Sequence, residues 1–532
     1  MNIITKEDKD MKKSVVLLLG LAMAASLLAG CGNSTDPQTT GTATTGGNEG
    51  TGEAKDTIVW AQSGDINSLD FHVGKQYLSY GVTCNIFDTL VSWDADNNVI
   101  PMLATEWEFL DGDSIQFKLR EGVTFHDGEP FTAEDVKYTY ERARDHTIVK
   151  NNFSWLESVD VVDDYTVVIN TIGAYSPVLN ALCSPLCGIM PKHLMEANEN
   201  AMAEFPIGTG PYKFVERAEG EYIKMEANED YWGGTPKTKY LEMRVVPETS
   251  QRSVLLETGE IDFAYDVLPS DVERLNGNEN LQVLEDVSFK TFYLTLNCTS
   301  EDTPALQDAR VRMAIECAID KDTLCDAVMY GYAEPIGTLL APGVFGYSES
   351  VPANTYDVER AKELLAEAGY ADGFSMSIWV PSSDQTRQEA CIVIQDMLRE
   401  VGIEASVEPM DSQVMDDRMV KGEDFGMSSS MWYNLMGDAD YAYYSNISPE
   451  STSNFAHYNN PELLQELLDA RSIQDDTQRA AVYDHIGQVL SEERPYIPMW
   501  SYNNLVGASK TQEGFQMNPV SAYRYENVVV YE

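Results

Sequence analysis

Short apolar runs alternate with amphipathic stretches from residue 57 to the end of the chain, and this pattern predicts α/β lobes. The run 58–61 is expected to form a buried strand that ends in a polar loop at 63–65. A hairpin is predicted over 106–119, because two alternating runs face each other across Asp111-Gly112, a strong turn signal.

Helix signals follow at several points. Thr132 with Asp135 three residues later predicts a helix over 133–144, since Thr132 can cap it and Asp135 suits the helix dipole. Asp357 is expected to cap a second helix that ends at Ala368, before Gly369. Further elements are expected as helices over 461–471 and 476–492 and as a strand over 496–506.

The N-terminal region has the layout of an export signal. Lys12 and Lys13 precede an apolar run from Val15 to Leu28, which is shorter than the roughly 20 residues that a membrane span needs. Acidic residues crowd the first ten positions, so Met11 is the more natural start.

The end of this run, Leu28-Ala29-Gly30-Cys31, resembles a bacterial lipobox. The resemblance implies that 1–30 is a signal peptide and that the Cys31 thiol receives a diacylglycerol. Residues 31–56 are then expected to form a flexible tether, because Gly, Ser, Thr, Asn and Gln dominate them. We therefore expect a lipid-anchored protein on the extracytoplasmic face of a bacterial cell membrane.

The net charge of the chain restricts the classes of molecule that it can bind. Its formal net charge is −50, and no basic stripe is present to neutralise phosphates, so nucleic-acid binding is excluded. The acidic excess indicates a well-solvated surface, and it leaves cationic ligands open. Besides Cys31, seven cysteines remain; Cys183 and Cys187 are expected to be buried thiols, with a local disulfide as the alternative.

Catalytic and metal-binding patterns are missing from the sequence. None of the six histidines is spaced with another as a metal pair, and no nucleophile elbow, phosphate loop or dinucleotide fingerprint occurs. The segment 94–98 starts like a calcium loop, but it lacks the glycine and the glutamate that such a loop requires. We expect neither an enzyme nor a cofactor or metal site, and His126 is expected to be a packed or turn residue.

Residues 101–139 carry a long and specific resemblance. The stretch runs from Pro101 through Trp107 to Phe125-His126-Asp127-Gly128 and on to Val136. It resembles the signature of the dipeptide, oligopeptide and nickel-binding receptors of ABC transporters, solute-binding protein family 5. Four further segments agree in order: 206–214, 228–236, 255–262 and 308–321. The glycines at 208 and 210 are expected to permit a tight turn.

The resemblance implies a type II periplasmic-binding-protein clamshell, an α/β fold with an additional third domain of the cluster C type. The first lobe would comprise 57–92, 206–296 and 500–532. The extra domain would be 93–205, and the second large lobe 297–499. Crossing strands would form the hinge, and the lobes would close over a ligand.

The expected binding residues lie on two segments. Ser63, Gly64 and Asp65 follow the first strand, and the segment from Ser428 to Asp440 should form the pocket of the second lobe. The candidates there are Trp432, Tyr433, Asn434, Asp438 and Asp440. Peptide-binding members have an Asp three residues after the Trp, which grips the ligand's α-amino group, but Leu435 stands there in this chain. Asp438 or Asp440 is expected to replace that contact.

We therefore expect a monomeric substrate-binding protein that captures oligopeptides or dipeptides and delivers them to ABC permease subunits. Two alternatives use the same fold. One is a receptor for an oligosaccharide or another small solute, with a sugar stacked on Trp432. The other is a sensor lipoprotein that signals rather than transports.

Overall fold

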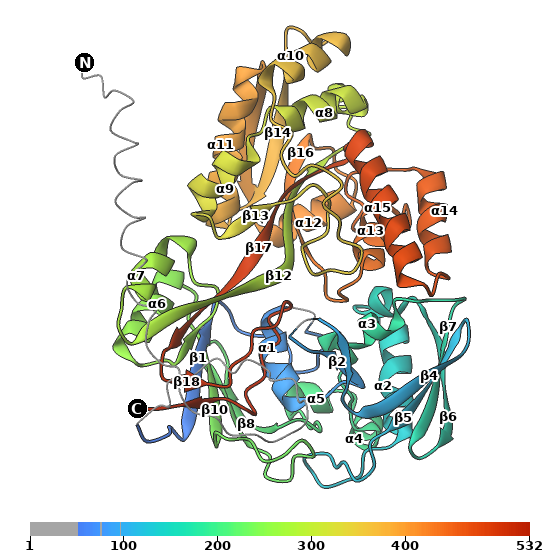
Figure 1. The fold of residues 1–532 in the computed structure, drawn as a ribbon, viewed down its shortest axis with the longest axis vertical. Helices are drawn as coiled ribbons and strands as arrows, with labels where there is room; N and C mark the ends of the chain where they lie inside the picture. The colour runs from blue at the N-terminus through green and yellow to red at the C-terminus, as the bar shows by residue number, and fades with distance from the viewer. Residues whose placement is uncertain (1–51, 75–76, 96) are drawn as a thin grey trace, which may run out of the picture. The chain divides into compact units, whose positions relative to one another are not determined.

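The computed structural model describes residues 52–74, 77–95 and 97–532. An 11-stranded mixed sheet is its largest element (Figure 1). The hydrogen-bonded order of its strands is β15 (Ile403–Met410), β14 (Phe374–Pro381), β16 (Met427–Tyr433), β12 (Leu281–Leu296), β17 (Tyr496–Ser509), β11 (Phe263–Ala264), β1 (Thr57–Gln62), β10 (Tyr240–Val245), β9 (Tyr222–Ala227) and β8 (Tyr212–Ala218), with β13 (Ala333–Pro335) pairing with β17.

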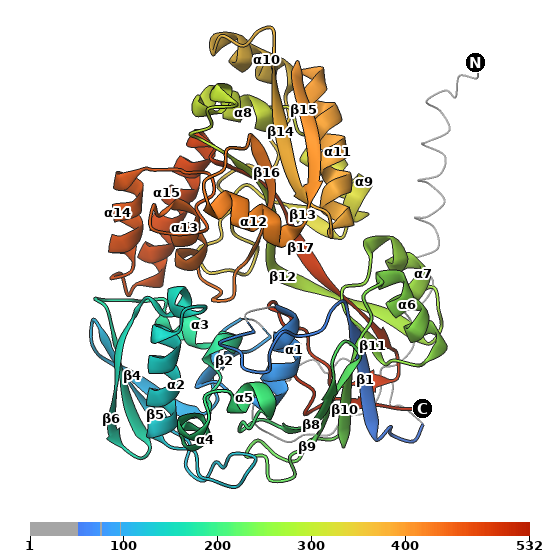
Figure 2. The ribbon, with the colours of Figure 1, turned by 180° about the vertical axis from the view of Figure 1, so that it is seen from behind.

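Two long strands join the halves of this sheet. β12 and β17 run side by side from β11 and β1 to β16 and β14, as Figures 1 and 2 show from opposite sides. The antiparallel β12–β17 ladder is interrupted between Val287 and Thr291, where the register shifts. Such an irregularity bends a strand and re-aims its side chains. Residues 288–290 therefore lie at the point where one half of the sheet passes into the other.

A separate antiparallel sheet has the order β4 (Ala104–Asp111), β5 (Ser114–Leu119), β7 (Thr166–Thr171) and β6 (Leu156–Asp163). β4 and β5 form the predicted hairpin, with Trp107 opposite Phe117. Helix α2 (Ala133–Asp145) packs against β6 and β7, and Thr132 and Asp135 form its capping box. The hairpin and this helix start are confirmed.

The other predicted helices are also confirmed, including the one that Asp357 caps through the Arg360 amide. The α-helices of the described residues besides α2, with the confirmed ones included, are α1 (Tyr77–Ile86), α3 (Val178–Leu182), α4 (Lys192–Ala197), α5 (Ala201–Glu204), α6 (Thr249–Thr258), α7 (Val272–Asn276), α8 (Ala309–Cys317), α9 (Lys321–Met329), α10 (Val358–Glu367), α11 (Gln385–Glu400), α12 (Ser412–Val420), α13 (Ala439–Ile447), α14 (Pro461–Ala470) and α15 (Asp476–Glu493). Short strand pairs are β2 (Val91–Trp93) with β3 (Val99–Pro101) and β18 (Gln512–Glu513) with β19 (Val529–Val530).

Close backbone packing explains the glycines at 208 and 210. A Cβ at Gly208 would lie 2.0 Å from the Ile86 carbonyl oxygen, and one at Gly210 would lie 2.6 Å from the Ile86 carbonyl group. Neither glycine has a positive φ angle. The chain bends at 209–211, and these positions require glycine because the bend passes against the end of α1 rather than because of a positive φ angle.

His126 forms hydrogen bonds with the backbone of the segment 208–210, and its expected role as a packed residue is confirmed. Its Nδ1 accepts a hydrogen bond from the Gly208 amide at 3.3 Å, and its Nε2 lies 2.9 Å from the Gly210 carbonyl oxygen. This pairing requires a neutral ring with the proton on Nε2. Burial lowers the pKa of His126 to about 4, in spite of the opposing contact with Gly210.

The seven cysteines among the described residues are free thiols, and both Cys183 and Cys187 are buried. The expectation of buried thiols at these two positions is confirmed. Burial raises the pKa of the Cys183 thiol, which keeps it protonated. Cys31, the expected lipidation site, lies outside the described residues, as do the signal peptide and all but the last residues of the tether.

Candidate functional site

The first expected binding segment follows β1 directly. Ser63, Gly64 and Asp65 are partly buried, and the Gln62 side chain donates a hydrogen bond to the Gly64 carbonyl. The Asp65 carboxylate lies 3.0 Å from the Arg217 guanidinium and accepts a hydrogen bond from the Gly220 amide at 2.7 Å. Burial alone would raise the pKa of Asp65, but the hydrogen bonds from Gly220 and Arg217 lower it. Asp65 is therefore engaged in tying this loop to the β8–β9 hairpin.

Trp432 and Tyr433 end strand β16 and are both half-buried. The Trp432 ring lies 5.0 Å from the Tyr441 ring, and its indole Nε1 has no hydrogen-bond partner among the described residues. The Tyr433 ring meets the Tyr77 ring of α1 at 5.9 Å in an edge-on contact. β16 and α1 are far apart in the sequence, so this contact joins the second expected binding segment to α1.

Asn434 and Asp438 build the turn that follows β16. The Asn434 side chain donates to the Asp438 carbonyl at 2.9 Å, and the Asn434 amide donates to the Phe289 carbonyl at 3.0 Å. The Asp438 carboxylate is fully buried, lies 2.6 Å from Arg479 and accepts a hydrogen bond from the Asp440 amide. These groups are saturated by contacts within the protein.

Asp440 is also buried in an ion pair. Its carboxylate contacts Arg471 at 2.7 Å and 3.1 Å and accepts a hydrogen bond from the Tyr175 hydroxyl at 3.3 Å. Leu435, which stands where the sequence departs from the pattern of the peptide-binding members, is buried in an apolar cluster. Neither Asp438 nor Asp440 thus offers a free carboxylate to a ligand in this structure.

Other residues around Tyr433 had no signal in the sequence. The Lys290 Nζ lies 5.3, 5.8 and 5.5 Å from the ring centroids of Tyr77, Tyr433 and Tyr502. The nearby Asp266 carboxylate and burial raise the pKa of Tyr77, while a hydrogen bond with Ser63 opposes the shift. Asp266 itself has a left-handed φ of 52°, a strained conformation that is often found at functional sites.

A second charged group lies next to this cluster. Arg387, in the first turn of α11, contacts the Asp384 carboxylate at 2.7 Å and the Ser429 carbonyl at 3.3 Å. Burial raises the pKa of Tyr502, and the Asp384 charge adds to this effect. Five residues thus converge where the two halves of the sheet meet: Ser63 from the loop after β1, Tyr77 from α1, Lys290 from β12, Tyr433 from β16 and Tyr502 from β17. We refer to these five residues as the hinge cluster.

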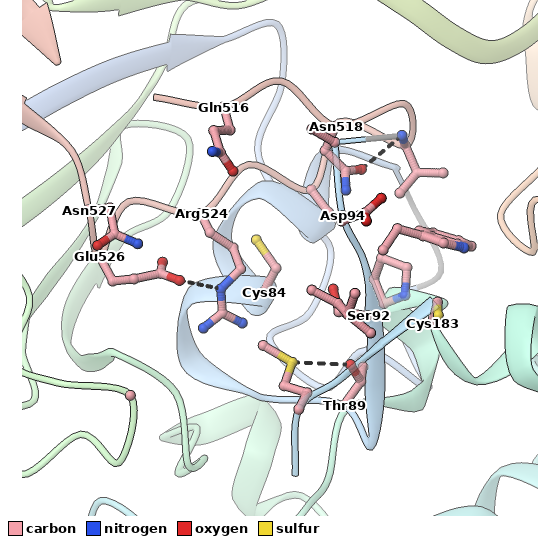
Figure 3. A pocket seen from close by; sticks show the side chains of 18 of the residues that line it. Cys84, Thr89, Ser92, Asp94, Cys183, Gln516, Asn518, Arg524, Glu526 and Asn527 are labelled. Atoms are coloured by element: carbon pink, nitrogen blue, oxygen red, sulfur yellow. Dashed lines mark hydrogen bonds and ion pairs between the residues drawn. The ribbon is translucent and has the colours of Figure 1, made fainter. Parts of the chain in front are cut away.

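A cavity of about 410 Å³ is lined by none of the five residues of the hinge cluster (Figure 3). Its walls come from 83–102, 183–185, 231–233 and 514–527, and none of them comes from 297–499. Arg524 points into it but is paired with Asp88 at 3.0 Å and Glu526 at 3.1 Å. Because no residue of β16 or α11 lines this cavity, a ligand bound in it would not contact both halves of the large sheet.

The arrangement at the hinge cluster suits binding rather than catalysis, since it offers aromatic faces, a cation and hydrogen-bond donors. No group of three or more His, Cys, Asp or Glu that could hold a metal ion occurs in the described part of the chain. None of the helices in those residues is long and apolar enough to cross a membrane.

Comparison with known families identifies the chain. Residues 98–454 match the model of "Bacterial extracellular solute-binding proteins, family 5 Middle". The protein therefore belongs to this family of extracellular solute-binding proteins. The family is not catalytic, so the expectation that the chain is not an enzyme is confirmed.

Relatives align over nearly the whole chain. The glutathione-binding protein GsiB of Pectobacterium atrosepticum is 29% identical over 487 residues, covering 89% of this chain and 94% of that protein. The periplasmic binding protein DppA of Helicobacter pylori, solved with the peptide STSA, is 27% identical with a TM-score of 0.78, covering 90% and 98%. The oligopeptide-binding protein AppA of Bacillus subtilis, solved with a nonapeptide, is 26% identical with a TM-score of 0.76, covering 90% and 99%. The expected α/β fold of the cluster C type is confirmed.

Proposed function

We propose that this protein captures short peptides between the two halves of its large sheet and delivers them to the permease subunits of an ABC importer. The observation that carries the proposal is the similarity, over about nine tenths of the chain, to two proteins solved with bound peptides. GsiB is named for the binding of glutathione, which is a tripeptide, and so supports the same class of ligand. Delivery to an ABC permease is supported by the description of DppA as ABC transporter-associated.

Within this proposal the expected lobes keep their boundaries. The lobe of 57–92, 206–296 and 500–532 would close against the lobe of 297–499, with 93–205 as the additional domain. The two crossing strands, β12 and β17, are suited to be the hinge, since they connect the halves of the sheet. Trp432 and Tyr433 would contact the ligand, and the free indole Nε1 of Trp432 would donate to it.

Native mass spectrometry of the protein purified from cells tests this function. We expect a series of masses that match short peptides bound at one per chain. In Trp432→Ala the retained series should weaken, because a buried aromatic anchor contributes roughly 1–3 kcal/mol to binding.

Tyr240→Ala is the matched control, because this aromatic residue is exposed on β10, and it should leave the series unchanged. A bound oligosaccharide would replace the peptide proposal by the alternative of a sugar receptor. Intact binding in Trp432→Ala would place the ligand away from β16.

We further propose that Cys31 carries a lipid that holds the protein at the membrane. Cys31→Ser should abolish lipidation and move the protein from the detergent phase to the aqueous phase in a phase-partition assay. Retention of Cys31→Ser in the detergent phase would show that something other than this thiol anchors the chain.

A further inference from the structure

Lys290 occupies a special position on the crossing strand β12. It follows Ser288 and Phe289 in the stretch where the β12–β17 register breaks, and it pairs with Tyr433 across β16. Its side chain is half-buried. Irregularities of this kind occur next to binding sites because they turn a side chain out of the regular ladder. The strand irregularity thus places a cation at the junction of the two halves of the sheet.

Three tyrosine rings surround that cation. The Nζ atom is within 6 Å of the rings of Tyr77, Tyr433 and Tyr502, which belong to three different elements. Each such contact attracts an ammonium group to the face of a ring. The rings hold the ammonium in place, but they provide no strong acceptor for its three N–H groups.

Lys290 has no acidic partner. Among the described residues, its Nζ forms no ion pair and donates no hydrogen bond to an acceptor atom. The neighbouring Arg387, in contrast, is neutralised by Asp384 at 2.7 Å. Lys290 is therefore the cation of this site that is available to an external anion.

The two carboxylates that the sequence offers for a peptide's ammonium group are engaged. Asp438 is paired with Arg479, and Asp440 with Arg471. Leu435 provides no charge at the position between them and Trp432. Asp438, Leu435 and Asp440 thus leave no free carboxylate for a ligand on this segment, whereas Lys290 offers an ammonium group.

We propose that Lys290, held by Tyr77, Tyr433 and Tyr502, is the binding site for a carboxylate of the ligand, which makes the protein a receptor for peptides with a free carboxylate. This inference rests on the proposed function. The carboxylate can belong to the C-terminus of a peptide or to an acidic side chain. Either would supply the acceptors that the cage lacks, and charge-assisted hydrogen bonds are among the stronger ones in proteins.

The test uses the full chain and two random tripeptide libraries, one with free C-termini and one with C-terminal amides. Native mass spectrometry reports what wild type, Lys290→Met, Lys290→Arg and the control Lys421→Met retain; Lys421 is an exposed lysine after α12. We expect the wild type to bind the free-acid library roughly tenfold to hundredfold more tightly than neutral members of the amidated library. Lys290→Met should lose this preference, while Lys290→Arg and Lys421→Met keep it.

The outcomes separate this inference from the proposed function. Selective retention of Asp- and Glu-containing amides that depends on Lys290 would support the proposal and assign the carboxylate to a side chain. Equal binding of acids and neutral amides by the wild type, or an unchanged preference in a folded Lys290→Met, would overturn the role of Lys290 and leave the peptide receptor standing. Retention of neither library by the wild type would overturn the peptide function, and this inference with it.

Discussion

Asp438→Asn is expected to lower the free energy of unfolding by about 3 kcal/mol, because it removes the buried counter-charge of a buried guanidinium. Asp438 and Arg479 are both almost completely buried, and their charged groups are 2.6 Å apart. Asparagine can still cap α13 through the Asp440 amide, so the loss reports the charge rather than the cap. Urea titrations of wild type and variant at pH 7 measure the difference.

A matched control is available on the same arginine. Asp476 contacts Arg479 at 3.2 Å, but its side chain is 74% exposed. Asp476→Asn should therefore change the free energy of unfolding by less than about 0.5 kcal/mol. In the double variant Asp438→Asn/Arg479→Met the loss should be smaller than the sum of the two single losses, because the uncompensated charge is gone.

This experiment also decides between two roles for Asp438. The sequence predicts that Asp438 contacts the ligand, whereas in the structure its carboxylate forms an ion pair with Arg479. If Asp438→Asn kept wild-type stability but lost affinity for peptides, the ligand role would stand and the ion pair would be dispensable. The expected pattern is the reverse: lower stability, with the peptide affinity retained where the protein is folded.

Features with a local cause could be predicted from the sequence. The hairpin across residues 111 and 112, the capping box at Thr132 and the cap at Asp357 each depend on residues within a few positions of one another. The predicted helices at 461–471 and 476–492 match α14 and α15 to within a residue at each end, because their apolar faces and caps are also local.

The candidate site depends on contacts between distant segments, so most of it could not be predicted. Nothing near Asp65, Asp438 or Asp440 shows that Arg217, Arg479 and Arg471 neutralise them. The position of Lys290 depends on a register break in a ladder whose partner strand lies about two hundred residues further on. Trp432 and Tyr433 could be proposed because the family resemblance aligned them. Their contact with a ligand remains a prediction.

The free energy of unfolding is also expected to fall strongly when the pH is lowered, because of His126. The pKa of His126 in the folded protein is about 4, below the ordinary value of 6.5 that applies after unfolding. Between these two pKa values His126 is protonated in the unfolded chain but neutral in the folded protein. The stabilising contribution of the neutral ring is therefore complete above pH 6.5 and is lost as the pH falls toward 4. This group alone should cost about 2 kcal/mol of the free energy of unfolding between pH 7 and pH 5.

The physical reason lies in the two hydrogen bonds of the ring. Protonation of Nδ1 would remove the acceptor for the Gly208 amide and place a charge on a partly buried ring. The segment 208–210 passes so closely against Ile86 that it has little room to adjust. Acid should therefore loosen the contact between the 125–131 turn and the segment 208–210, at the junction of the expected extra domain with the first lobe.

Comparison with His126→Gln isolates this contribution from the many acidic groups that titrate in the same range. The glutamine variant should be less stable than wild type at pH 7, because it loses the acceptor for Gly208, but its stability should fall less steeply toward pH 5 by about 2 kcal/mol. His485→Gln is the control, since this histidine is exposed and forms its hydrogen bond with the Glu466 side chain rather than with a backbone segment. Parallel pH profiles for wild type and His126→Gln would contradict a neutral His126, and they would mean that this segment holds its place against Ile86 by packing alone.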